Sequence, residues 1–474
     1  MGKLIGRVAE QKQMRKYVES EQAEFIAVYG RRRVGKTFLI REMFGNEFAF
    51  EVSGTIGGKR GEQMFNFMQA LRRFGYEGSE SPATWNEAFD LLQRLLQPKV
   101  ERTRCILFFD ELPCFDTPRA GFVKAFEHFW NGWASQYPGI KLIVCGSATS
   151  WMVDNIIDNH GGLHNRITHE VHLAPFALAE VEQYCTAYGF AWSRLSILHV
   201  YMAMGGIPYY LSLLDNTQSP AQNIDRLLFS EHGELHREYD RLFRSLFTAP
   251  DAYMAIIAAL VENKQGISRE EIATKVKLAN NGHLTKLLTN LVNCDFIRRY
   301  STKEKKVKAN AHLYQLTDMF ILFHHTFAKR PTTDPHYWSN MMGTPAMSAW
   351  LGLAFERVCL LHIPQIKQAL GIGGIHTEYY AWRSKQSTPA VQIDLIIERA
   401  DQMINLCEVK YSEYPYAIDK NEEARMRLRI GAFSSETACR KGILPTFITT
   451  FGLNRNAHSG LVAGEVTMDD LFKE

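Results

Sequence analysis

One eight-residue stretch constrains this chain more than any other feature. Residues 30–37 form the sequence GRRRVGKT, which fits the pattern GxxxxGK followed by Ser or Thr. An apolar β-type run, FIAVY, precedes it, and a helix-like segment, TFLIREMF, follows it. A glycine-rich turn between a buried strand and a helix lets backbone N–H groups surround an anion, and the helix N-terminus adds a favourable dipole. The stretch therefore predicts a phosphate-binding loop in an α/β domain.

The chemistry of such a loop assigns a role to several of its residues. Gly30 and Gly35 allow the backbone to fold around the phosphates. Lys36 is expected to reach the β- and γ-phosphates, and Thr37 to give its hydroxyl to Mg²⁺. The expected ligands are therefore ATP and Mg²⁺. The three loop arginines, 31–33, could touch phosphate, but we expect them to be solvated. The alternative for the whole stretch is an ordinary glycine turn.

Polar residues follow two further apolar strands. CILFF is followed by Asp110 and Glu111. We expect Asp110, on a strand beside that of the phosphate loop, to hold the Mg²⁺ shell, and Glu111 to polarise the attacking water; the alternative is an acidic turn after a core strand. KLIVCG ends at Ser147, which could sense the γ-phosphate, although Gly-Ser is also a common turn. Arg166 follows at a place where an arginine could reach a nucleotide, and a surface arginine is the alternative.

GRRRVGKT, CILFFDE, LIVCGS and GGIPYYL (205–211) together resemble the archaeal-type ATPases, a group in the STAND branch of the AAA+ proteins. The resemblance covers about residues 1–245. It implies a helical lid in which Gly206 and Pro208 lie over the nucleotide, with a helix-breaking turn as the alternative. Members of the group often carry a winged helix and a C-terminal module similar to PD-(D/E)xK nucleases, so both are expected further along the chain.

The order of apolar and amphipathic segments divides the chain into five parts. Strand-like and helix-like segments alternate over residues 1–175, which indicates a parallel sheet covered on both faces. The following parts are a helical lid (176–245), three helices with a charged hairpin in the winged-helix pattern (246–330), a turn-rich linker (331–345) and a small α/β domain similar to restriction endonucleases (346–474). The expected fold class is α/β, built on the parallel sheet of the P-loop NTPases.

The last part contains a second set of charged residues, in VQIDLIIER and INLCEVKYS. Glu408 and Lys410 lie two residues apart on one predicted strand and so share a face, and Asp394 lies on the strand before it. Glu356, on a preceding helix, could supply a third acid, and Lys420 is a weaker candidate. Carboxylates that hold Mg²⁺ beside a lysine that orients hydroxide form a simple phosphodiesterase site. The alternatives are a nuclease fold with an inactive site and a surface salt-bridge cluster.

Charge and cysteine usage limit the remaining possibilities. The net charge is only +3, so evidence for nucleic-acid binding must be local. It lies at residues 298–308, where Arg298, Arg299 and four lysines face one acid, Glu304; a wing on the DNA backbone or a solvated hairpin would both explain them. Eight cysteines without a CxxC pair indicate buried free thiols in a reducing compartment. Since the N-terminus lacks a signal-peptide pattern and no run approaches 18 apolar residues, we expect a cytoplasmic protein that does not use the membrane.

These observations favour an ATP-binding and ATP-hydrolysing switch coupled to a C-terminal module that binds, and in one version cleaves, DNA or another nucleic acid. The alternative is a signalling scaffold in which the nucleotide controls assembly and the C-terminal domain binds a protein partner. Nucleotide-dependent oligomerisation is compatible with both hypotheses.

Overall fold

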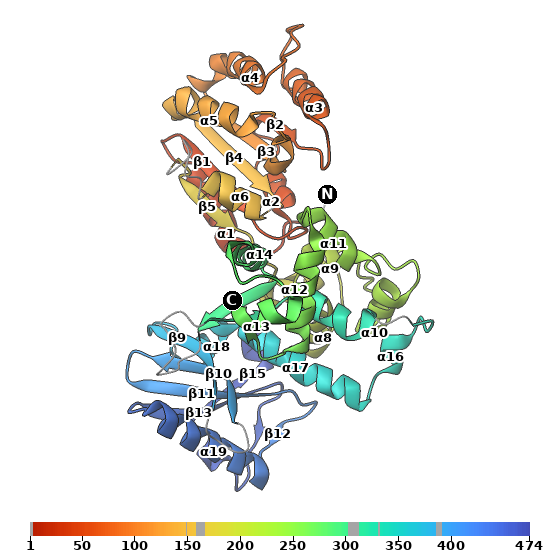
Figure 1. The fold of residues 1–474 in the computed structure, drawn as a ribbon, viewed down its shortest axis with the longest axis vertical. Helices are drawn as coiled ribbons and strands as arrows, with labels where there is room; N and C mark the ends of the chain where they lie inside the picture. The colour runs from red at the N-terminus through yellow and green to blue at the C-terminus, as the bar shows by residue number, and fades with distance from the viewer. Residues whose placement is uncertain (1–2, 148, 158–165, 302–311, 330–331, 385–390) are drawn as a thin grey trace. The chain divides into compact units, whose positions relative to one another are not determined.

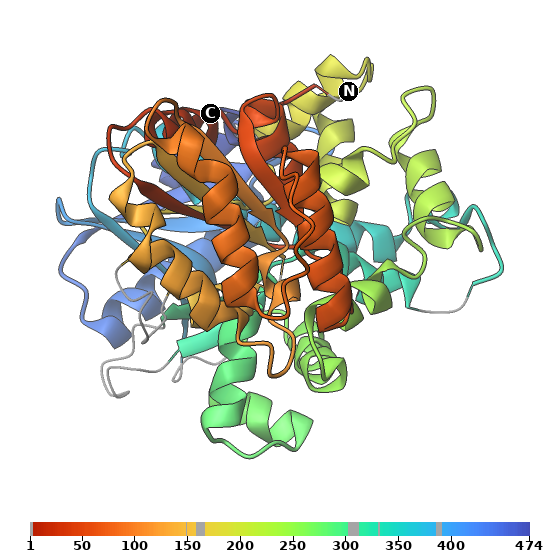
Figure 2. The ribbon, with the colours of Figure 1, turned by 90° about the horizontal axis from the view of Figure 1, so that it is seen from above.

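The computed structural model describes residues 3–147, 149–157, 166–301, 312–329, 332–384 and 391–474. The chain divides into two compact units (Figure 1, Figure 2). The first unit consists of residues 1–175 with two short segments, 244–248 and 293–295. The second unit contains residues 176–243, 249–292 and 296–474.

The first unit is built on a five-stranded parallel sheet with the strand order β2-β3-β4-β1-β5. The three central strands are buried along almost their whole length, whereas the two edge strands are half exposed. Continuous apolar runs therefore mark the centre of the sheet, as expected where helices cover both faces. The strands are β1 (Glu24–Tyr29), β2 (Phe48–Ser53), β3 (Cys105–Asp110), β4 (Ile140–Gly146) and β5 (His169–His172).

Helices cover both faces of this sheet, which confirms the predicted α/β class. Alternate side chains of β1 enter two separate apolar cores, with Phe25 and Ala27 in one and Ile26 and Val28 in the other. The first core also contains residues of α3, α4 and α5, and the second contains residues of α1 and α2 (Figure 1). The helices are α1 (Val8–Val18), α2 (Lys36–Phe44), α3 (Arg60–Arg73), α4 (Trp85–Val100), α5 (Phe122–Gly132) and α6 (Thr149–Met152).

The strand order corrects one detail of the sequence prediction. β3, which ends at Asp110, does not lie beside the phosphate-loop strand β1, because β4 lies between them. The carboxyl ends of all five strands nevertheless point to the same edge, since the sheet is parallel. Side chains that follow β1, β3 and β4 can therefore still meet at that edge.

The second unit begins with helices, where the lid was predicted, and continues with the predicted three helices and hairpin strands. The three strands β6, β8 and β7 form an antiparallel sheet in that order. The tip of the hairpin, residues 302–311, lies outside the described residues. The elements are α7 (Leu178–Ala187), α8 (Arg194–Met204), α9 (Pro208–Leu211), α10 (Pro220–Ile224), α11 (Glu238–Leu246), α12 (Pro250–Glu262), β6 (Ile267–Ser268), α13 (Arg269–Val276), α14 (Gly282–Asn293), β7 (Ile297–Ser301), β8 (His312–Leu316) and α15 (Met319–Phe323).

The predicted linker is instead a packed segment. It contains α16 (Tyr337–Asn340), whose Trp338 side chain is buried. The Asp225 carboxylate accepts hydrogen bonds from the backbone N–H groups of Trp338 (2.7 Å) and Ser339 (3.1 Å). The buried tryptophan and the capped helix hold this segment against the rest of the unit. Its turn-rich composition was therefore a misleading sign of a flexible linker.

The last part of the second unit is a five-stranded sheet with the order β15-β13-β11-β10-β9. β9, β10 and β11 are antiparallel neighbours, whereas β13 and β15 run parallel to β11. The elements are α17 (Pro345–Leu361), α18 (Ile363–Ala369), β9 (Thr377–Arg383), β10 (Gln392–Arg399), β11 (Met403–Lys410), β12 (Tyr416–Ala417), α19 (Lys420–Thr437), β13 (Gly442–Thr449), β14 (Leu453–Asn454), β15 (Gly464–Thr467) and α20 (Met468–Leu471).

Two chain-wide expectations can be compared with these elements. All eight cysteines are free; six are buried, whereas Cys114 and Cys439 are partly exposed. Among the described residues, no single helix is both long and apolar enough to cross a membrane. Within the same described ranges, α17 and α18 taken together reach that length and apolarity, and the chain bends by 80° between them.

Candidate functional site

Two glycines shape the loop between β1 and α2. Gly30 has a φ of 142°, and a Cβ at this position would lie 2.3 Å from the carbonyl oxygen of Leu173. Gly35 has a φ of 92° with open space around it, so its backbone conformation, rather than crowding, favours glycine. Arg33 also has a positive φ, of 73°. Turns of this kind direct backbone N–H groups into a concave anion site, as the motif predicts.

Lys36 is held against this loop. Its ammonium donates to the carbonyl oxygens of Gly30 (2.9 Å) and Arg31 (3.0 Å), and the residue is only 5 % exposed. Burial lowers the pKa of Lys36, while the nearby Asp110 and Glu111 carboxylates oppose that shift. A buried cation at the loop is well placed to pair with a phosphate. Arg31 is also buried, so the prediction that all three loop arginines are solvated is wrong for that residue.

The Asp110 carboxylate is the point at which several elements meet. Its Oδ1 accepts from the Thr37 hydroxyl (2.9 Å), the Cys145 thiol (2.8 Å) and the backbone N–H of Glu111 (3.1 Å). Its Oδ2 accepts from the Ser53 hydroxyl (3.3 Å). Asp110 thus lies at the carboxyl end of β3 with contacts to α2, β4 and β2.

The pair formed by Thr37 and Asp110 suits Mg²⁺. The ion prefers oxygen ligands and usually takes only one or two protein carboxylates, with phosphates and waters completing its shell. The Thr37 hydroxyl and the Asp110 carboxylate supply such oxygens side by side. Burial, reinforced by the Asp110 charge, raises the pKa of the Cys145 thiol, so this neighbour remains a neutral hydrogen-bond donor.

Glu111 is fixed at the same edge of the sheet by Ser147. The Ser147 backbone N–H donates to Oε2 of Glu111 (3.0 Å), and the Ser147 hydroxyl donates to Oε1 (2.5 Å). Glu111 itself has a φ of 48°, an uncommon conformation for this residue type. A carboxylate held by two donors beside the phosphate loop can orient a water molecule and accept its proton.

The sequence analysis did not identify Arg7, which forms a hydrogen bond to the phosphate loop. Arg7 is buried, has a φ of 56°, and donates through Nη2 to the carbonyl oxygen of Val34 (3.4 Å). Its Nη1 also pairs with Glu10 (3.6 Å). The available signal was the Gly-Arg pair immediately before the amphipathic helix α1. Ser53 and Cys145 were missed as well, because their roles depend on which strands flank β3.

Arg166 does not join the phosphate loop within this chain. The neighbouring Thr168 donates its backbone N–H to Phe25 at the start of β1 (3.0 Å), and His169 is the first residue of β5. Since β5 and β1 are parallel, Arg166 lies at the amino-terminal edge of the sheet, opposite Asp110. Arg166 is exposed there.

The GGIP segment lies in the second unit, where Pro208 begins α9. Gly206 allows a close approach of two backbone segments, because a Cβ there would lie 1.9 Å from the carbonyl oxygen of Phe176. The Gly206 carbonyl in turn accepts from the N–H of Phe176 (2.7 Å). These contacts give Gly206 a structural role, and the proposed nucleotide contact of Pro208 stays a prediction.

The structure places Glu408 and Lys410 together on β11, as the i, i+2 spacing predicts. The Lys410 ammonium lies 2.7 Å from Glu408 and 3.3 Å from Glu422 of α19. Arg429, also on α19, pairs with the second Glu408 oxygen (3.3 Å). Burial opposes the Lys410 charge, but the two carboxylates outweigh it and raise the pKa of Lys410. Glu422 and Arg429 were not predicted, because only the fold brings α19 over β11.

The hydrogen-bond and ion-pair partners of Glu356 and Asp394 differ from those of Glu408 and Lys410. Glu356, on α17, forms an ion pair with Arg357 (2.5 Å), and burial raises the pKa of Glu356 to about 7, helped by the Asp394 charge and opposed by that of Arg357. Asp394 accepts a hydrogen bond from the side chain of Gln392. In the strand register, Leu395 pairs with Cys407, so Asp394 and Glu408 are adjacent at that end of the ladder.

The predicted three-carboxylate metal site is not assembled in the structure. In the described parts of the chain, no three His, Cys, Asp or Glu side chains are placed to hold a metal ion. Both oxygens of Glu408 are paired with cations, and Glu356 is paired with an arginine. Lys420 is exposed at the start of α19, away from the buried side of that helix. The charged cluster of Glu408, Lys410, Glu422 and Arg429 is not the predicted surface salt-bridge cluster either, since Glu422 is only 1 % exposed.

Arg298 of the predicted basic hairpin is turned inward. Its Nε donates to Gln315 on the neighbouring strand (2.7 Å), and its guanidinium lies 4.6 Å from the centre of the Tyr300 ring. Burial lowers the pKa of Arg298 to about 10. Arg298 is therefore unavailable to a phosphate backbone, whereas Arg299 is exposed. Residues 303–308, with the lysines of the hairpin, lie outside the described residues.

Comparison with known proteins finds relatives for the part of the chain that contains the site at the sheet edge. Residues 4–214 match a family described as an ATPase domain predominantly from Archaea. An uncharacterized protein of Methanocaldococcus jannaschii is 23 % identical over 358 residues, which cover 75 % of this chain and 76 % of that protein. The first part of the chain is therefore similar to ATPase domains of archaeal type, and the GRRRVGKT loop lies inside the matched range.

Three solved structures show partial similarity to this chain. A Walker-type ATPase of Pyrococcus abyssi has a TM-score of 0.46 and 19 % identity, over 67 % of this chain and 95 % of that one. The ORC2 protein of Aeropyrum pernix, in ADPNP and ADP complexes, has a TM-score of 0.34 and 12 % identity, over 67 % and 91 %. A STAND protein of Pyrococcus horikoshii with a tetratricopeptide-repeat sensor has a TM-score of 0.31 and 14 % identity, over 78 % and 51 %.

Proposed function

We propose that this chain is a Mg²⁺-dependent ATPase that acts as a switch, because residues 4–214 match a family of ATPase domains found predominantly in Archaea. One observation carries the proposal. The Thr37 hydroxyl and the Asp110 carboxylate lie 2.9 Å apart, and Glu111 follows directly with both of its oxygens held by Ser147. All three side chains lie at the same edge of the sheet, which supports oxygen ligands for Mg²⁺ beside a base for water.

Each residue of the site has a defined task in this reaction. The loop between Gly30 and Gly35 binds phosphate oxygens through backbone N–H groups, and Lys36 pairs with their charge. Thr37 and Asp110 would hold Mg²⁺, which neutralises charge on the phosphates when bound. The Glu111 carboxylate orients the attacking water and takes its proton.

The second part of the proposal couples this switch to nucleic acid. Its support is the unit of three helices and a three-stranded sheet formed by α12–α14 and β6–β8, which has the element order of a winged helix. The exposed Arg299 and the lysines at 303–308 would contact the phosphate backbone. In the last domain, Asp394, Glu408 and Lys410 occupy adjacent strands. In its strongest form, the proposal therefore includes cleavage of the nucleic acid by these residues.

A specific observation favours the second candidate, a signalling scaffold whose C-terminal domain binds a protein partner. Lys410 and Arg429 already neutralise the Glu408 carboxylate, so a metal ion would have to displace at least one of these ion pairs. Buried charges that pair with one another need no catalytic task to explain them, since removing one partner would leave an uncompensated buried charge.

One experiment tests ATP hydrolysis and the nuclease version of the first candidate together. Purified protein is incubated with Mg²⁺, ATP and labelled plasmid, and both phosphate release and nicking are measured, with Asp394→Asn and Lys410→Ala as variants. We expect phosphate release that EDTA abolishes. Nicking that both variants lose would establish the nuclease version, whereas no nicking under any nucleotide condition would favour the scaffold.

A further inference from the structure

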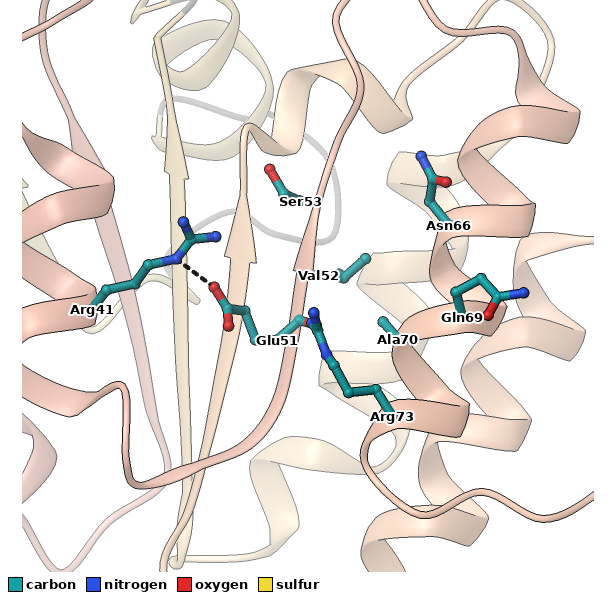
Figure 3. Close-up of a pocket in the computed structure, with 8 residues that line it drawn as sticks. All are labelled: Arg41, Glu51, Val52, Ser53, Asn66, Gln69, Ala70 and Arg73. Carbon is teal, nitrogen blue, oxygen red and sulfur yellow. Dashed lines mark hydrogen bonds and ion pairs between the residues drawn. The ribbon is translucent and has the colours of Figure 1, made fainter.

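A cavity of about 440 Å³ opens at the free edge of the first unit's sheet, between α2 and α3 (Figure 3). Edge strand β2 forms one wall and α3 forms the other. Its volume falls within the range of small-molecule sites, roughly 300–1,000 Å³. The residues that line it are Arg41, Glu51, Val52, Ser53, Asn66, Gln69, Ala70 and Arg73.

The charged side chains leave this cavity with an excess positive charge. Arg41 reaches from α2 to Glu51 and forms an ion pair with it (2.6 Å; Figure 3). Arg73, from α3, donates to the backbone carbonyl oxygen of Glu51 (2.9 Å) rather than to a carboxylate. Two arginines and one glutamate give the lining a formal charge of +1, so the cavity favours an anion.

Backbone and side-chain polar groups add hydrogen-bonding capacity. The N–H of Gly54 donates to Asp110 on β3 (2.9 Å), and backbone groups alternate in direction along a strand. The N–H and C=O of Ser53 therefore point away from β3, toward the open edge. On the opposite wall, α3 presents the side-chain amides of Asn66 and Gln69.

The cavity is connected to the proposed ATPase site through Ser53. The Ser53 hydroxyl donates to Oδ2 of Asp110 (3.3 Å), whose Oδ1 is bonded to Thr37. Arg41 lies on α2, the helix that begins with Lys36. A molecule in the cavity would therefore touch both a hydrogen-bond partner of the Mg²⁺-site acid and the helix behind the phosphate loop.

We propose that this cavity binds a small organic oxyanion, a carboxylate or phosphate monoester that carries further hydrogen-bonding groups. Its anionic group pairs with Arg73, and its polar groups bond to the Ser53 backbone and the α3 amides. Binding changes nucleotide affinity through Ser53 and Asp110. Only this coupling rests on the proposed ATPase function; the binding site stands on the cavity alone.

Binding is tested on the full chain without nucleotide, by calorimetric titration. N-acetylglycine probes the carboxylate class and methyl phosphate probes the phosphate class. We expect at least one to bind, Arg73→Gln to weaken it about tenfold through loss of a charge-assisted hydrogen bond, and Arg73→Lys to restore part of the affinity. Arg72→Gln is the matched control, since Arg72 is exposed on the same helix but does not line the cavity.

Three results would overturn the assignment of this site. They are the absence of binding by both probes, an equal loss with Arg72→Gln, and binding of methyl phosphate that depends on Lys36 but not on Arg73, which would locate the anion in the phosphate loop. None of them depends on whether the protein hydrolyses ATP.

Coupling is tested by measuring the affinity for a fluorescent ATP analogue with and without saturating probe. We expect the probe to change nucleotide affinity severalfold in the wild type but not in Ser53→Ala, which should still bind the probe. If the probe binds and nucleotide affinity is unchanged, the coupling is wrong. If the wild type binds no nucleotide, the proposed ATPase function fails, while the probe titration still decides the cavity.

Discussion

Four groups donate hydrogen bonds to the Asp110 carboxylate: the Thr37 and Ser53 hydroxyls, the Cys145 thiol and the Glu111 backbone N–H. Only some of these contacts could be predicted from the sequence. Thr37 and Asp110 belong to motifs whose chemistry names their roles, and the structure places them 2.9 Å apart. Ser53 and Cys145 come from the strands on either side of β3. Strand order is a property of the tertiary fold, so no local pattern could have assigned these two residues to the site.

Lys36→Ala should lower ATP affinity by about 100-fold or more, because it removes the buried cation at the loop. The substitution also frees the carbonyl oxygens of Gly30 and Arg31, so circular dichroism should accompany the nucleotide titration. Lys124→Ala, at an exposed position on α5, is the control. ATP affinity equal to that of the wild type would show that Lys36 does not contact phosphate.

Ser147→Ala should lower the turnover number for ATP by about tenfold while ATP affinity stays within about threefold. The hydroxyl is one of two donors that fix Glu111, and the backbone N–H remains in the variant. Comparison of kcat and KM separates this orienting role from binding. A raised KM with unchanged kcat would instead assign Ser147 to nucleotide binding.

The elements that sequence predicted best are the ones buried on all sides. β1, β3 and β4 are continuous apolar runs because helices cover both faces of the sheet centre. β2 (FAFEVS) and β5 (HEVH) are half-exposed edge strands with charged or polar positions, so they lack that signature. The five-stranded order therefore followed only from the structure.

His362, which contacts the start of helix α7, makes the stability of the fold depend on pH. His362 accepts the N–H of Leu178 at Nε2 (3.1 Å), and its Nδ1 lies 2.8 Å from the Val358 carbonyl oxygen, so the ring must be neutral. Burial lowers the pKa of His362 to about 4. Because the folded pKa lies below the unfolded one, its contribution is present above pH 6.5 and is lost as the pH falls toward 4.

We expect protonation of His362 to lower the free energy of unfolding of the wild type by up to about 3 kcal/mol between pH 6.5 and pH 4. His362→Gln retains a donor and an acceptor but cannot become charged, so its stability should fall less steeply. Denaturant unfolding at several pH values measures both. Parallel pH profiles for the two proteins would show that His362 is not responsible.

Across the whole molecule, the first boundary was within reach of sequence reasoning and the later ones were not. The main segment of the first unit ends at Pro175, where the alternation of strands and helices stops, and two short later segments, 244–248 and 293–295, also belong to it. The four parts that follow lie almost entirely in one unit, held by contacts between distant segments, such as His362 with Leu178 and Arg357 with the Lys264 carbonyl. Such contacts leave no periodic pattern in the sequence, which is why a packed segment was predicted to be a linker.

Replacing Lys305, Lys306 and Lys308 with alanine tests whether this larger unit binds DNA. For every phosphate that the hairpin no longer neutralises, the slope of log affinity against log salt should become shallower by about one unit, up to about three in total. The measurement is a DNA titration at several salt concentrations, with Lys124→Ala as the control. An unchanged slope would show that the hairpin is only solvated.

ATP hydrolysis by the site around Asp110 is the central claim, and Glu111→Gln tests it most directly. Steady-state phosphate release and ATP binding are measured on the same samples of wild type and variant in Mg²⁺. The amide keeps the shape of Glu111 but cannot take a proton from water. We therefore predict ATP affinity within about threefold of the wild type and a loss of at least about 100-fold in turnover. Hydrolysis at the wild-type rate by Glu111→Gln would contradict this mechanism.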